Sequence, residues 1–367
     1  MFRKGIMINF LKEGHEVFVL APYDDYSKQI EELGCQYIEV PMDNKGASIF
    51  KDLLLLRRLY KHYKKILPDL IFHYTIKPNI FGTMAAHYAK TKSIAVITGL
   101  GYTFINQGLA AKAAKQLYKL ALPKSRKVWF INHEDRKMFI KEGLLSRDLI
   151  EILPGEGVDM VKYSPIEKSR NDGKFVFVLI ARLLWDKGVG EFVQAAKEIK
   201  KTYQNTEFQL VGFVDVKNPQ AISKEQVLYW VEKGWITYKG STNDVRDFIS
   251  SADCVVLPSY REGISKILLE SASMKKPIIA SNVPGCRDVV ENAGSGYLCK
   301  VKNTNDLILK MEKMLTLSKS ELLNMGEKGR NLVKDEFDEN IIIKKYSQSI
   351  KYHTLKGEEN GGFVKKY

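Results

Sequence analysis

The chain has 367 residues, of which 45% are hydrophobic and 27% are charged, and its formal net charge is +14. This composition is typical of a soluble globular protein, and the length exceeds what one ordinary hydrophobic core holds, so we expect two domains. Because the sequence contains no run of eighteen apolar residues, we expect no transmembrane helix.

Strands and helices alternate through the first half of the chain. We expect strands over residues 16–21, 37–40, 70–73, 94–98 and 128–132, and helices over 2–11, 51–67 and 79–90. The second half repeats this rhythm, with strands over 175–180, 208–211, 236–239, 254–258 and 277–281 and helices over 188–203 and 245–251. The pattern is typical of α/β folds with parallel sheets covered by helices. We therefore expect two doubly wound, Rossmann-like domains that face a cleft, with ligands at the carboxyl ends of the strands.

The polar stretch at residues 162–174 is interpreted as a linker between these domains. We place an N-terminal domain at 1–165 and a C-terminal domain at 172–340. A terminal helix over 341–354 is expected to pack back on the N-terminal domain. The Gly- and Lys-rich tail over 355–367 is expected to be flexible.

The charge of the chain indicates the kind of partner it binds, and its cysteines indicate the compartment in which it works. Most of the positive excess lies in residues 1–170, whose net charge is +9 against +5 for the remainder. This excess indicates an anionic surface or ligand. No zinc pattern, RNP-type motif or basic tail accompanies it, so we expect an anionic membrane surface and no nucleic acid. The four cysteines are scattered, which indicates reduced thiols in a cytoplasmic protein.

Two polar segments follow strands of the first domain and should therefore face the cleft. The first is H-Y-T-I-K-P-N-I-F-G at 73–82, which contains Lys77 and Asn79. The second is T-G-L-G-Y at 98–102, which contains Gly99, Gly101 and Tyr102. The histidines of this half, His73 and His133, are interpreted as structural.

The segment A-R-L-L-W-D-K-G at 181–188 follows the first strand of the second domain. Arg182 and Lys187 stand where a strand ends and a helix begins, where they could neutralise a diphosphate and stabilise it as a leaving group. Taken alone, they could equally be ordinary surface cations. Gly212 ends the strand over 208–211 and would serve either the approach of a ligand or a turn. Asn243 is placed near a nucleobase.

Residues 257–290 place two carboxylates across a loop-to-helix junction. Glu262 precedes the expected helix, Ser265 could cap it, and Glu270 lies about two turns inside it. Such a junction directs free backbone N–H groups at a phosphate. The two carboxylates could then hold opposite ends of a nucleotide sugar, although such a pair also occurs by chance on a solvated helix. Pro284-Gly285 is interpreted as a further turn.

This region resembles the donor-binding signature of the retaining glycosyltransferases of family 4. The matching segments are E-G-I-S-K-I-L-L-E-S, K-K-P-I-I and P-G-C-R-D, spread over more than thirty residues, and the R-x4-K-G spacing of the 182–188 segment matches as well. The segments at 73–82 and 98–102 resemble one branch of this family. Members of that branch extend lipid-diphosphate-linked oligosaccharides with N-acetylhexosamine or galactose.

The resemblance implies a GT-B fold and a retaining glycosyltransferase. Its donor would be a UDP-sugar, from which a hexose or N-acetylhexosamine moves to a polyprenyl-diphosphate-linked saccharide in capsule, O-antigen or glycoprotein glycan assembly. Arg182 and Lys187 would stabilise the departing diphosphate, and Glu262 would hold the donor sugar. Glu270 would hold the ribose. The remaining donor residues would be Gly263, Ser265, Lys266, Gly212 and Asn243, and the acceptor-side residues would be Lys77, Asn79, Gly99, Gly101 and Tyr102.

No D-x-D triplet occurs, so we expect no bound metal, and no other cofactor is implied. The family also places a strand and loop of roughly twenty residues before the first helix seen here. We therefore expect an unpaired strand slot in the N-terminal sheet. A chain extended upstream should be more stable and more active.

Two helices of the first half carry basic faces. Arg57, Lys61 and Lys64 oppose an apolar face of Leu55, Leu59, Tyr63 and Ile66, and Lys112, Lys115 and Lys119 oppose Ala113, Leu117 and Leu120. They could be solvated amphipathic helices, and they could also dock on anionic lipid. We expect a peripheral location on the inner face of the cell membrane, because the acceptor implied by the resemblance is a membrane lipid.

Two other functions stay open. A UDP-sugar 2-epimerase shares the double Rossmann-like build, but the spacing and context of Glu262 and Glu270 argue against it. A basic membrane- or nucleic-acid-binding module would leave the 257–290 segment unexplained.

Overall fold

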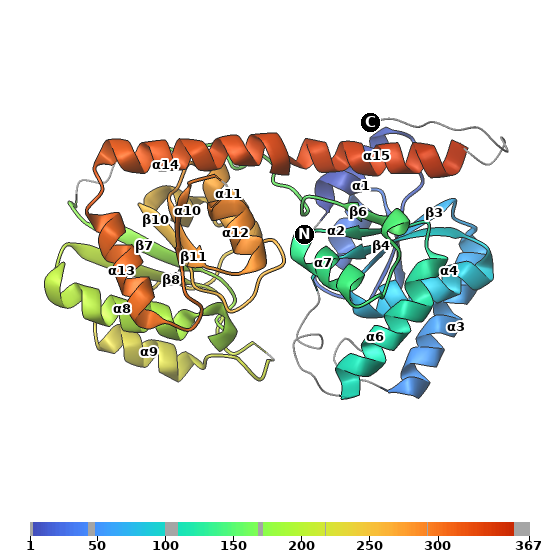
Figure 1. The fold of residues 1–367 in the computed structure, drawn as a ribbon, viewed down its shortest axis with the longest axis horizontal. Helices are drawn as coiled ribbons and strands as arrows, with labels where there is room; N and C mark the ends of the chain where they lie inside the picture. Colours follow the sequence, from blue (N-terminus) through green and yellow to red (C-terminus); the bar gives the residue numbers. More distant parts are fainter. Residues whose placement is uncertain are drawn as a thin grey trace. The chain divides into compact units, whose positions relative to one another are not determined.

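The structure is a computed structural model that describes residues 3–42, 48–99, 109–167, 172–216, 218–291 and 293–355. The chain divides into two compact units (Figure 1). Unit 1 comprises Met1–Glu156 and Asn340–Tyr367, and unit 2 comprises Gly157–Glu339. The division between the units falls at residue 156, a few residues before the linker interpreted from the sequence.

Unit 1 contains two parallel sheets. The first pairs β1 (Phe18–Ala21) with β2 (Gln36–Glu39), and the second has the order β3 (Leu70–Tyr74), β4 (Lys92–Ile97), β5 (Lys127–Phe130) and β6 (Ile150–Ile152). Its longer helices are α1 (Lys4–Lys12), α2 (Ser27–Glu32), α3 (Ile49–Ile66), α4 (Thr83–Ala89), α6 (Leu109–Ala121) and α7 (His133–Lys141). Short helical turns are η1 (Pro78–Gly82), η2 (Leu122–Lys124) and η3 (Arg147–Leu149).

Hydrogen bonding between the strands of unit 1 is interrupted between β1 and β3. Among the described residues, β1 pairs only with β2, and β3 pairs only with β4. Leu20 of β1 nevertheless packs into the same core as Ala95 and Ile97 of β4. The two sheets therefore share one hydrophobic layer, and the unpaired strand slot expected from the sequence stays a prediction.

The last described helix, α15 (Glu339–Leu355), completes the aromatic core of unit 1. Tyr346 lies edge-on to Phe72 and to Trp129, with ring centroids 4.9 Å away in both cases. Its hydroxyl accepts a hydrogen bond from that of Tyr74 at 3.0 Å. A helix that follows unit 2 in the sequence thus supplies a fully buried side chain to unit 1.

Unit 2 is built on one six-stranded parallel sheet of order β12-β11-β10-β7-β8-β9. The strands are β7 (Phe175–Ile180), β8 (Thr206–Val211), β9 (Thr237–Tyr238), β10 (Cys254–Leu257), β11 (Ile278–Ser281) and β12 (Gly296–Cys299). The helices are η4 (Trp185–Lys187), α8 (Val189–Thr202), α9 (Lys224–Glu232), α10 (Arg246–Ser251), α11 (Lys266–Ser273), α12 (Pro284–Val290), α13 (Thr304–Leu315), α14 (Lys319–Leu332) and η5 (Val333–Phe337).

Both faces of this sheet are buried, and β7 shows how the sequence achieves it. Val176 and Val178 enter the core under α10, α11 and α12, whereas Phe177 and Leu179 enter the core under α8, α9 and α13. Side chains of a strand alternate between its two faces, so a continuous apolar run buries both of them. The expected doubly wound, Rossmann-like organisation is confirmed in each unit.

Three local expectations are settled by the structure. The turn expected at Pro284-Gly285 is wrong, because α12 begins at Pro284, whose fixed φ suits the first helical position. The apolar face expected for α6 is also wrong: Leu120 is 61% exposed, whereas Ala114 and Tyr118 are buried. The four cysteines are free and buried, as expected.

Among the described residues, no helix combines the length and the apolar character needed to span a bilayer.

Candidate active site

The candidate donor site is formed by loops at the carboxyl edge of the unit 2 sheet. β7 lies between β10 and β8, and β10 lies between β11 and β7. Because all these strands are parallel, the loops that follow them emerge at the same edge. The sheet therefore places the 181–188 segment beside the 258–265 segment, as expected from the sequence.

A glycine allows these two loops to touch. Gly188 has φ +72°, and a Cβ atom on it would lie 2.1 Å from the carbonyl oxygen of Pro258. Only glycine fits such a position without strain. The backbone N–H of Tyr260 also donates to the carbonyl oxygen of Asp186 at 2.9 Å. Gly188 and the hydrogen bond between Tyr260 and Asp186 together fix the distance between the two loops.

This contact brings the expected leaving-group and sugar-binding residues together. The Nζ atom of Lys187 lies 2.6 Å from Oε1 of Glu262, and both side chains are mostly buried. Arg182 follows β7 on the same loop, is exposed, and has no ion pair among the described residues. The two expected leaving-group cations thus differ, because Lys187 is paired with a carboxylate and Arg182 is exposed.

Two helices begin beside this ion pair. A Cβ atom on Gly285, in the first turn of α12, would lie 1.8 Å from the carbonyl oxygen of Gly263, just before α11. The N-termini of α11 and α12 are therefore close together, and each contributes free N–H groups and a partial positive charge. The expected cap is wrong in its detail, because Ser265 occupies the N-cap position of α11 without a side-chain cap hydrogen bond.

Cys286 of α12 was not identified from the sequence as part of this region. Burial, and next the negative charge of Glu262, raise the pKa of its thiol well above the usual range, so it stays protonated. The influence of Glu262 and Lys187 on this thiol places it close to the ion pair. The P-G-C-R-D motif contains this residue, but nothing in its spacing distinguishes it from a core cysteine.

Glu270 occupies a separate environment on α11. It is only 6% exposed, and burial raises the pKa of its carboxyl group above the usual value. Lys266, one turn earlier, places its Nζ atom 3.8 Å from Oε1 of Glu270. Since Glu262 pairs with Lys187 instead, the two carboxylates have different partners. That they serve different parts of a ligand stays a prediction.

The surroundings of Glu270 include residues that the sequence interpretation missed. The Tyr163 side chain hydrogen-bonds Glu270, and burial raises the pKa of the Tyr163 hydroxyl strongly. Lys162 and Asp244 also act electrostatically on Glu270. The hydrogen bond from Arg246 lowers the pKa of Asp244 to about 2. Tyr163 lies in the stretch interpreted as a linker, where one aromatic residue among polar ones was the available signal.

Gly212 and Asn243 are the other two residues expected to bind the sugar donor. A Cβ atom on Gly212 would lie 1.9 Å from the carbonyl oxygen of Ala181, so the close backbone approach at this position is to the protein itself. The Tyr238 hydroxyl donates to the Gly212 carbonyl oxygen at 2.8 Å. Asn243 is exposed in the loop that follows β9. Contact of either residue with a donor stays a prediction.

Residues expected on the acceptor side follow β3 and β4, which are neighbours in the unit 1 sheet. Lys77 pairs with Asp52, with Nζ and Oδ1 2.7 Å apart. Asn79 is buried, and its amide donates to the carbonyl oxygen of Val96 at 2.9 Å. Gly99 has φ +131°, whereas Gly101 and Tyr102 lie outside the described residues. The acceptor role of all five stays a prediction.

His73 is a structural residue, as interpreted from the sequence. Its ring nitrogens lie 3.0 Å from the Tyr63 hydroxyl and 3.2 Å from the Thr83 hydroxyl. Burial lowers the pKa of His73 to about 3, so the ring is neutral. Among the described residues, no group of three or more histidine, cysteine, aspartate or glutamate side chains could hold a metal ion.

Solved structures define the class of protein to which this fold belongs. The chain superposes on a glycosyltransferase from Rickettsia africae with a TM-score of 0.79 and 18% identity, covering 96% of this chain and 94% of that one. It superposes on Anabaena HepE in complex with UDP and glucose with a TM-score of 0.76 and 16% identity, covering 95% and 94%. The fold is that of a GT-B glycosyltransferase.

Sequence relatives then define the family. A model described as glycosyl transferases group 1 matches residues 164–332, and one described as glycosyl transferase 4-like matches residues 3–132. The N,N'-diacetylbacillosaminyl-diphospho-undecaprenol alpha-1,3-N-acetylgalactosaminyltransferase of Campylobacter jejuni is 32% identical over 94% of this chain and 93% of its own length. The Escherichia coli UDP-Gal:alpha-D-GlcNAc-diphosphoundecaprenol alpha-1,3-galactosyltransferase is 28% identical over 80% of each. The chain belongs to the group 1, family 4-like glycosyltransferases, and it is an enzyme of that class.

The raised pKa of Glu270 leads to a test of stability. An unfolded glutamate ionises near pH 4.3, so the buried carboxylate costs stability as pH rises from there through the higher folded pKa. Glu270→Gln should therefore raise the melting temperature at pH 7 and flatten its fall between about pH 4 and pH 7. Melting curves across this range test it, with Glu232→Gln on exposed α9 surface as the control. A lower melting temperature for Glu270→Gln at pH 7 would contradict the assignment.

Proposed function

We propose that this protein is a retaining glycosyltransferase that moves a hexose or N-acetylhexosamine from a UDP-sugar to a lipid-diphosphate-linked saccharide. The observation that carries the proposal is the Lys187–Glu262 pair, held by the Gly188–Pro258 contact next to Arg182 and two helix N-termini. Cations and helix N-termini suit a diphosphate, and a carboxylate suits sugar hydroxyls. The nearby but separate Glu270 suits the hydroxyls of a ribose.

In the proposed reaction, the bond between the anomeric carbon and the UDP oxygen breaks while a bond to the acceptor oxygen forms on the same face. A phosphate oxygen of the departing UDP takes the proton of the acceptor hydroxyl. Arg182 and Lys187 stabilise the negative charge that develops on the diphosphate. Lys187 turns from Glu262 toward the phosphate when the donor binds, which frees Glu262 to accept hydrogen bonds from the donor sugar. No metal ion or other cofactor takes part.

The acceptor in this proposal is a polyprenyl-diphosphate-linked saccharide used in capsule, O-antigen or glycoprotein glycan assembly. The names of the Campylobacter and Escherichia relatives, whose acceptors are diphosphoundecaprenol-linked sugars, support this choice. A Staphylococcus aureus relative, 23% identical over 88% of this chain and 86% of its own length, is a capsular polysaccharide biosynthesis glycosyltransferase. Nucleic acid is not a partner in this proposal.

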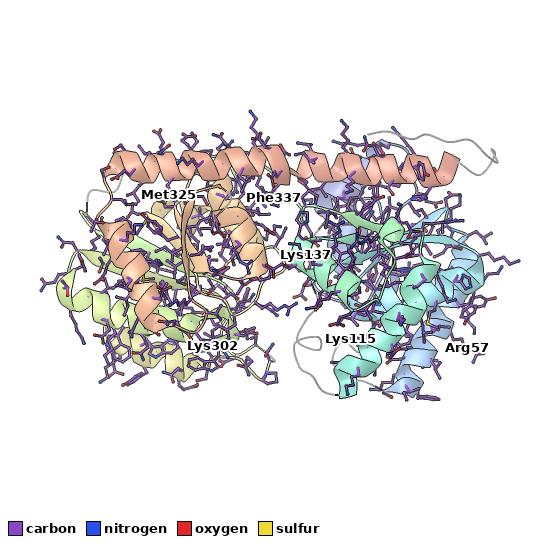
Figure 2. All side chains as sticks on the ribbon, in the orientation of Figure 1. Arg57, Lys115, Lys137, Lys302, Met325 and Phe337 are labelled. Atoms are coloured by element: carbon purple, nitrogen blue, oxygen red, sulfur yellow. The ribbon has the colours of Figure 1, made fainter. Side chains whose placement is uncertain are left out.

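We further propose that unit 1 meets the inner face of the cell membrane through α3 and α6. Arg57, Lys61 and Lys64 of α3 are exposed, and Leu55, Leu59 and Tyr63 are buried, as the sequence indicated. Figure 2 marks Arg57 on α3 and Lys115 on α6, and both helices pack against η1.

The first turns of α3 add exposed apolar side chains that the sequence interpretation missed. Ile49 and Phe50 are 79% and 78% exposed, and Leu53 is 58% exposed. Apolar side chains beside cations are typical of surfaces that lie on anionic lipid, because the former enter the headgroup boundary and the latter attract the headgroups.

UDP release measures the proposed activity directly. We expect release from one class of UDP-hexose or UDP-N-acetylhexosamine that depends on an added polyprenyl-diphosphate-linked saccharide, with retention at the anomeric carbon by NMR of the product. An epimerase would instead convert the donor without acceptor. No acceptor-dependent release from any of these donors would refute the proposal.

The division of roles in the donor site predicts contrasting variants. Arg182→Ala removes a charge-assisted phosphate contact and should weaken UDP binding about tenfold. Glu262→Ala should keep UDP affinity, because its partner Lys187 stays available, and should impair sugar transfer. Calorimetric titration with UDP tests both, with Lys201→Ala on the exposed end of α8 as the charge-matched control. Equal losses of UDP affinity in the Arg182 and Glu262 variants would show that the roles are wrongly divided.

Membrane attachment predicts binding to vesicles that contain anionic lipid, and this binding should weaken as salt rises. Changing Lys112, Lys115 and Lys119 to Glu should reduce it more than tenfold, since each cation near the surface contributes about 1 kcal/mol. Lys115 should contribute least, because it pairs with Glu142 at 2.7 Å. Changing the exposed Lys319, Lys328 and Lys334 of unit 2 to Glu provides the control. Equal cosedimentation with neutral and anionic vesicles would refute the attachment.

A further inference from the structure

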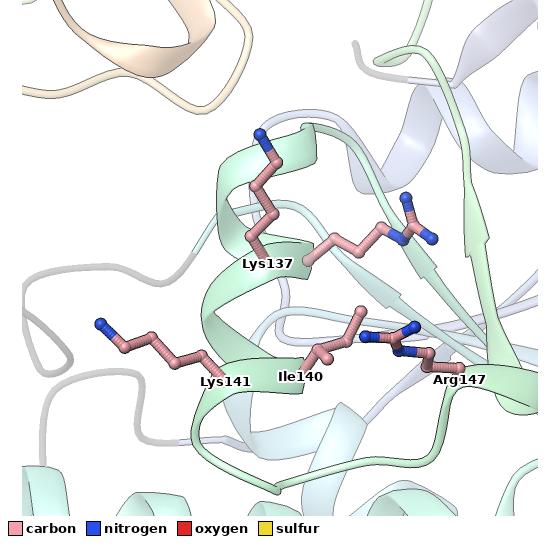
Figure 3. Close-up of a pocket in the computed structure, with 5 residues that line it drawn as sticks. Lys137, Ile140, Lys141 and Arg147 are labelled. Carbon is pink, nitrogen blue, oxygen red and sulfur yellow. The ribbon is translucent and has the colours of Figure 1, made fainter.

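A hollow lined by four cations lies between α7 and η3 of unit 1 (Figure 3). We call it the basic hollow, and its volume is about 460 Å³. Its lining consists of Arg136, Lys137, Ile140, Lys141 and Arg147. Figure 3 shows the Arg147 guanidinium beside the Ile140 side chain, while Lys137 and Lys141 extend from the helix. No carboxylate lines the basic hollow.

The four cations of the basic hollow have no partner in the part of the chain that the structure describes. None of them makes an ion pair or a side-chain hydrogen bond with a described residue. Two acidic side chains of this region are engaged elsewhere, because Asp135 accepts a hydrogen bond from the Asn132 amide and Glu142 pairs with Lys115. The four side chains gather at one hollow, where they would together stabilise a bound anion.

One atom of the basic hollow is buried as well as unpaired. The Nε atom of Arg136 is inaccessible to water and has no hydrogen-bond partner. A buried donor without a partner costs free energy. The cations that line the basic hollow are the observation that indicates a ligand.

We propose that the basic hollow binds a phosphate or diphosphate group. Two guanidinium groups present forked donors that match phosphate oxygens, and the two lysines add charge. No aromatic side chain lines the basic hollow, so it offers no stacking surface for a nucleobase. This site belongs to unit 1, whereas the donor diphosphate site belongs to unit 2.

The proposed function supplies two sources for such a group, and the assignment to either rests on that function. One source is the diphosphate that joins the acceptor saccharide to its lipid. The other is the phosphate headgroup of an anionic membrane lipid. Both present the same chemistry to Arg136 and Arg147, so the experiment has one arm for each.

The first arm measures binding of inorganic pyrophosphate by calorimetry, with the donor site saturated by UDP and the ionic strength held near 0.15 M. Wild type should bind pyrophosphate, and Arg136→Ala with Arg147→Ala should weaken this binding at least tenfold. Arg136→Lys with Arg147→Lys, which keeps the charge and loses the fork, should give an intermediate loss. Lys12→Ala with Lys28→Ala, on exposed parts of α1 and α2, removes equal charge and should have no effect.

The second arm measures cosedimentation of the same variants with vesicles of neutral lipid and of neutral lipid containing anionic phospholipid. A loss confined to pyrophosphate binding supports the acceptor diphosphate, and a loss confined to anionic vesicles supports the headgroup. If the double alanine variant equals wild type in both arms, the proposal is overturned. Neither arm measures sugar transfer. Both can therefore be interpreted even if the proposed enzymatic function is wrong.

Melting temperature separates a ligand site from a structural role. Removal of unpaired like charges should leave the melting temperature of the double alanine variant unchanged or higher. Pyrophosphate should raise the melting temperature of wild type and not that of the variant. A clearly lower melting temperature for the unliganded variant would overturn the proposal, because it would show that the arginines hold the fold.

Discussion

The contact between Gly188 and the carbonyl oxygen of Pro258 is the constraint on which the candidate active site depends. Loops after neighbouring parallel strands emerge at one edge, but they touch only if their backbones pack without an intervening side chain. At Gly188 a single Cβ atom would lie 2.1 Å from that oxygen and push the loops apart. The Lys187–Glu262 pair joins these two loops and therefore requires this spacing.

Two carboxylates of the site are held in arrangements that suit ligand binding better than they suit the stability of the fold. Glu270 is buried at a cost in stability, and Lys187 is paired with Glu262. A sugar attached to a phosphate supplies hydroxyl donors for that carboxylate. In the proposed function, Glu262 therefore exchanges Lys187 for the hydroxyl groups of the donor sugar.

Much of the fold could be predicted from the sequence, because apolar runs such as that of β7 and the turns between them mark strands of a doubly wound sheet. For Lys187 and Glu262, the sequence predicts only that their loops lie at the same edge of the sheet. It does not predict that the two side chains form an ion pair. Tyr163 and Cys286 could not be assigned, since their places beside Glu270 and Glu262 depend on long-range packing. The buried face of α6 was predicted wrongly, because alanines rather than leucines fill the close contact of this helix with the rest of unit 1.

The placement of Tyr346 has a consequence for how the protein forms during synthesis. Phe72 and Trp129 belong to the first half of the chain, yet the ring that covers them arrives only with α15, after all of unit 2. While the ribosome builds residues 157–339, these aromatic side chains lack the cover that Tyr346 provides. The N-terminal half therefore reaches its final packing only after the whole of unit 2 has been synthesised.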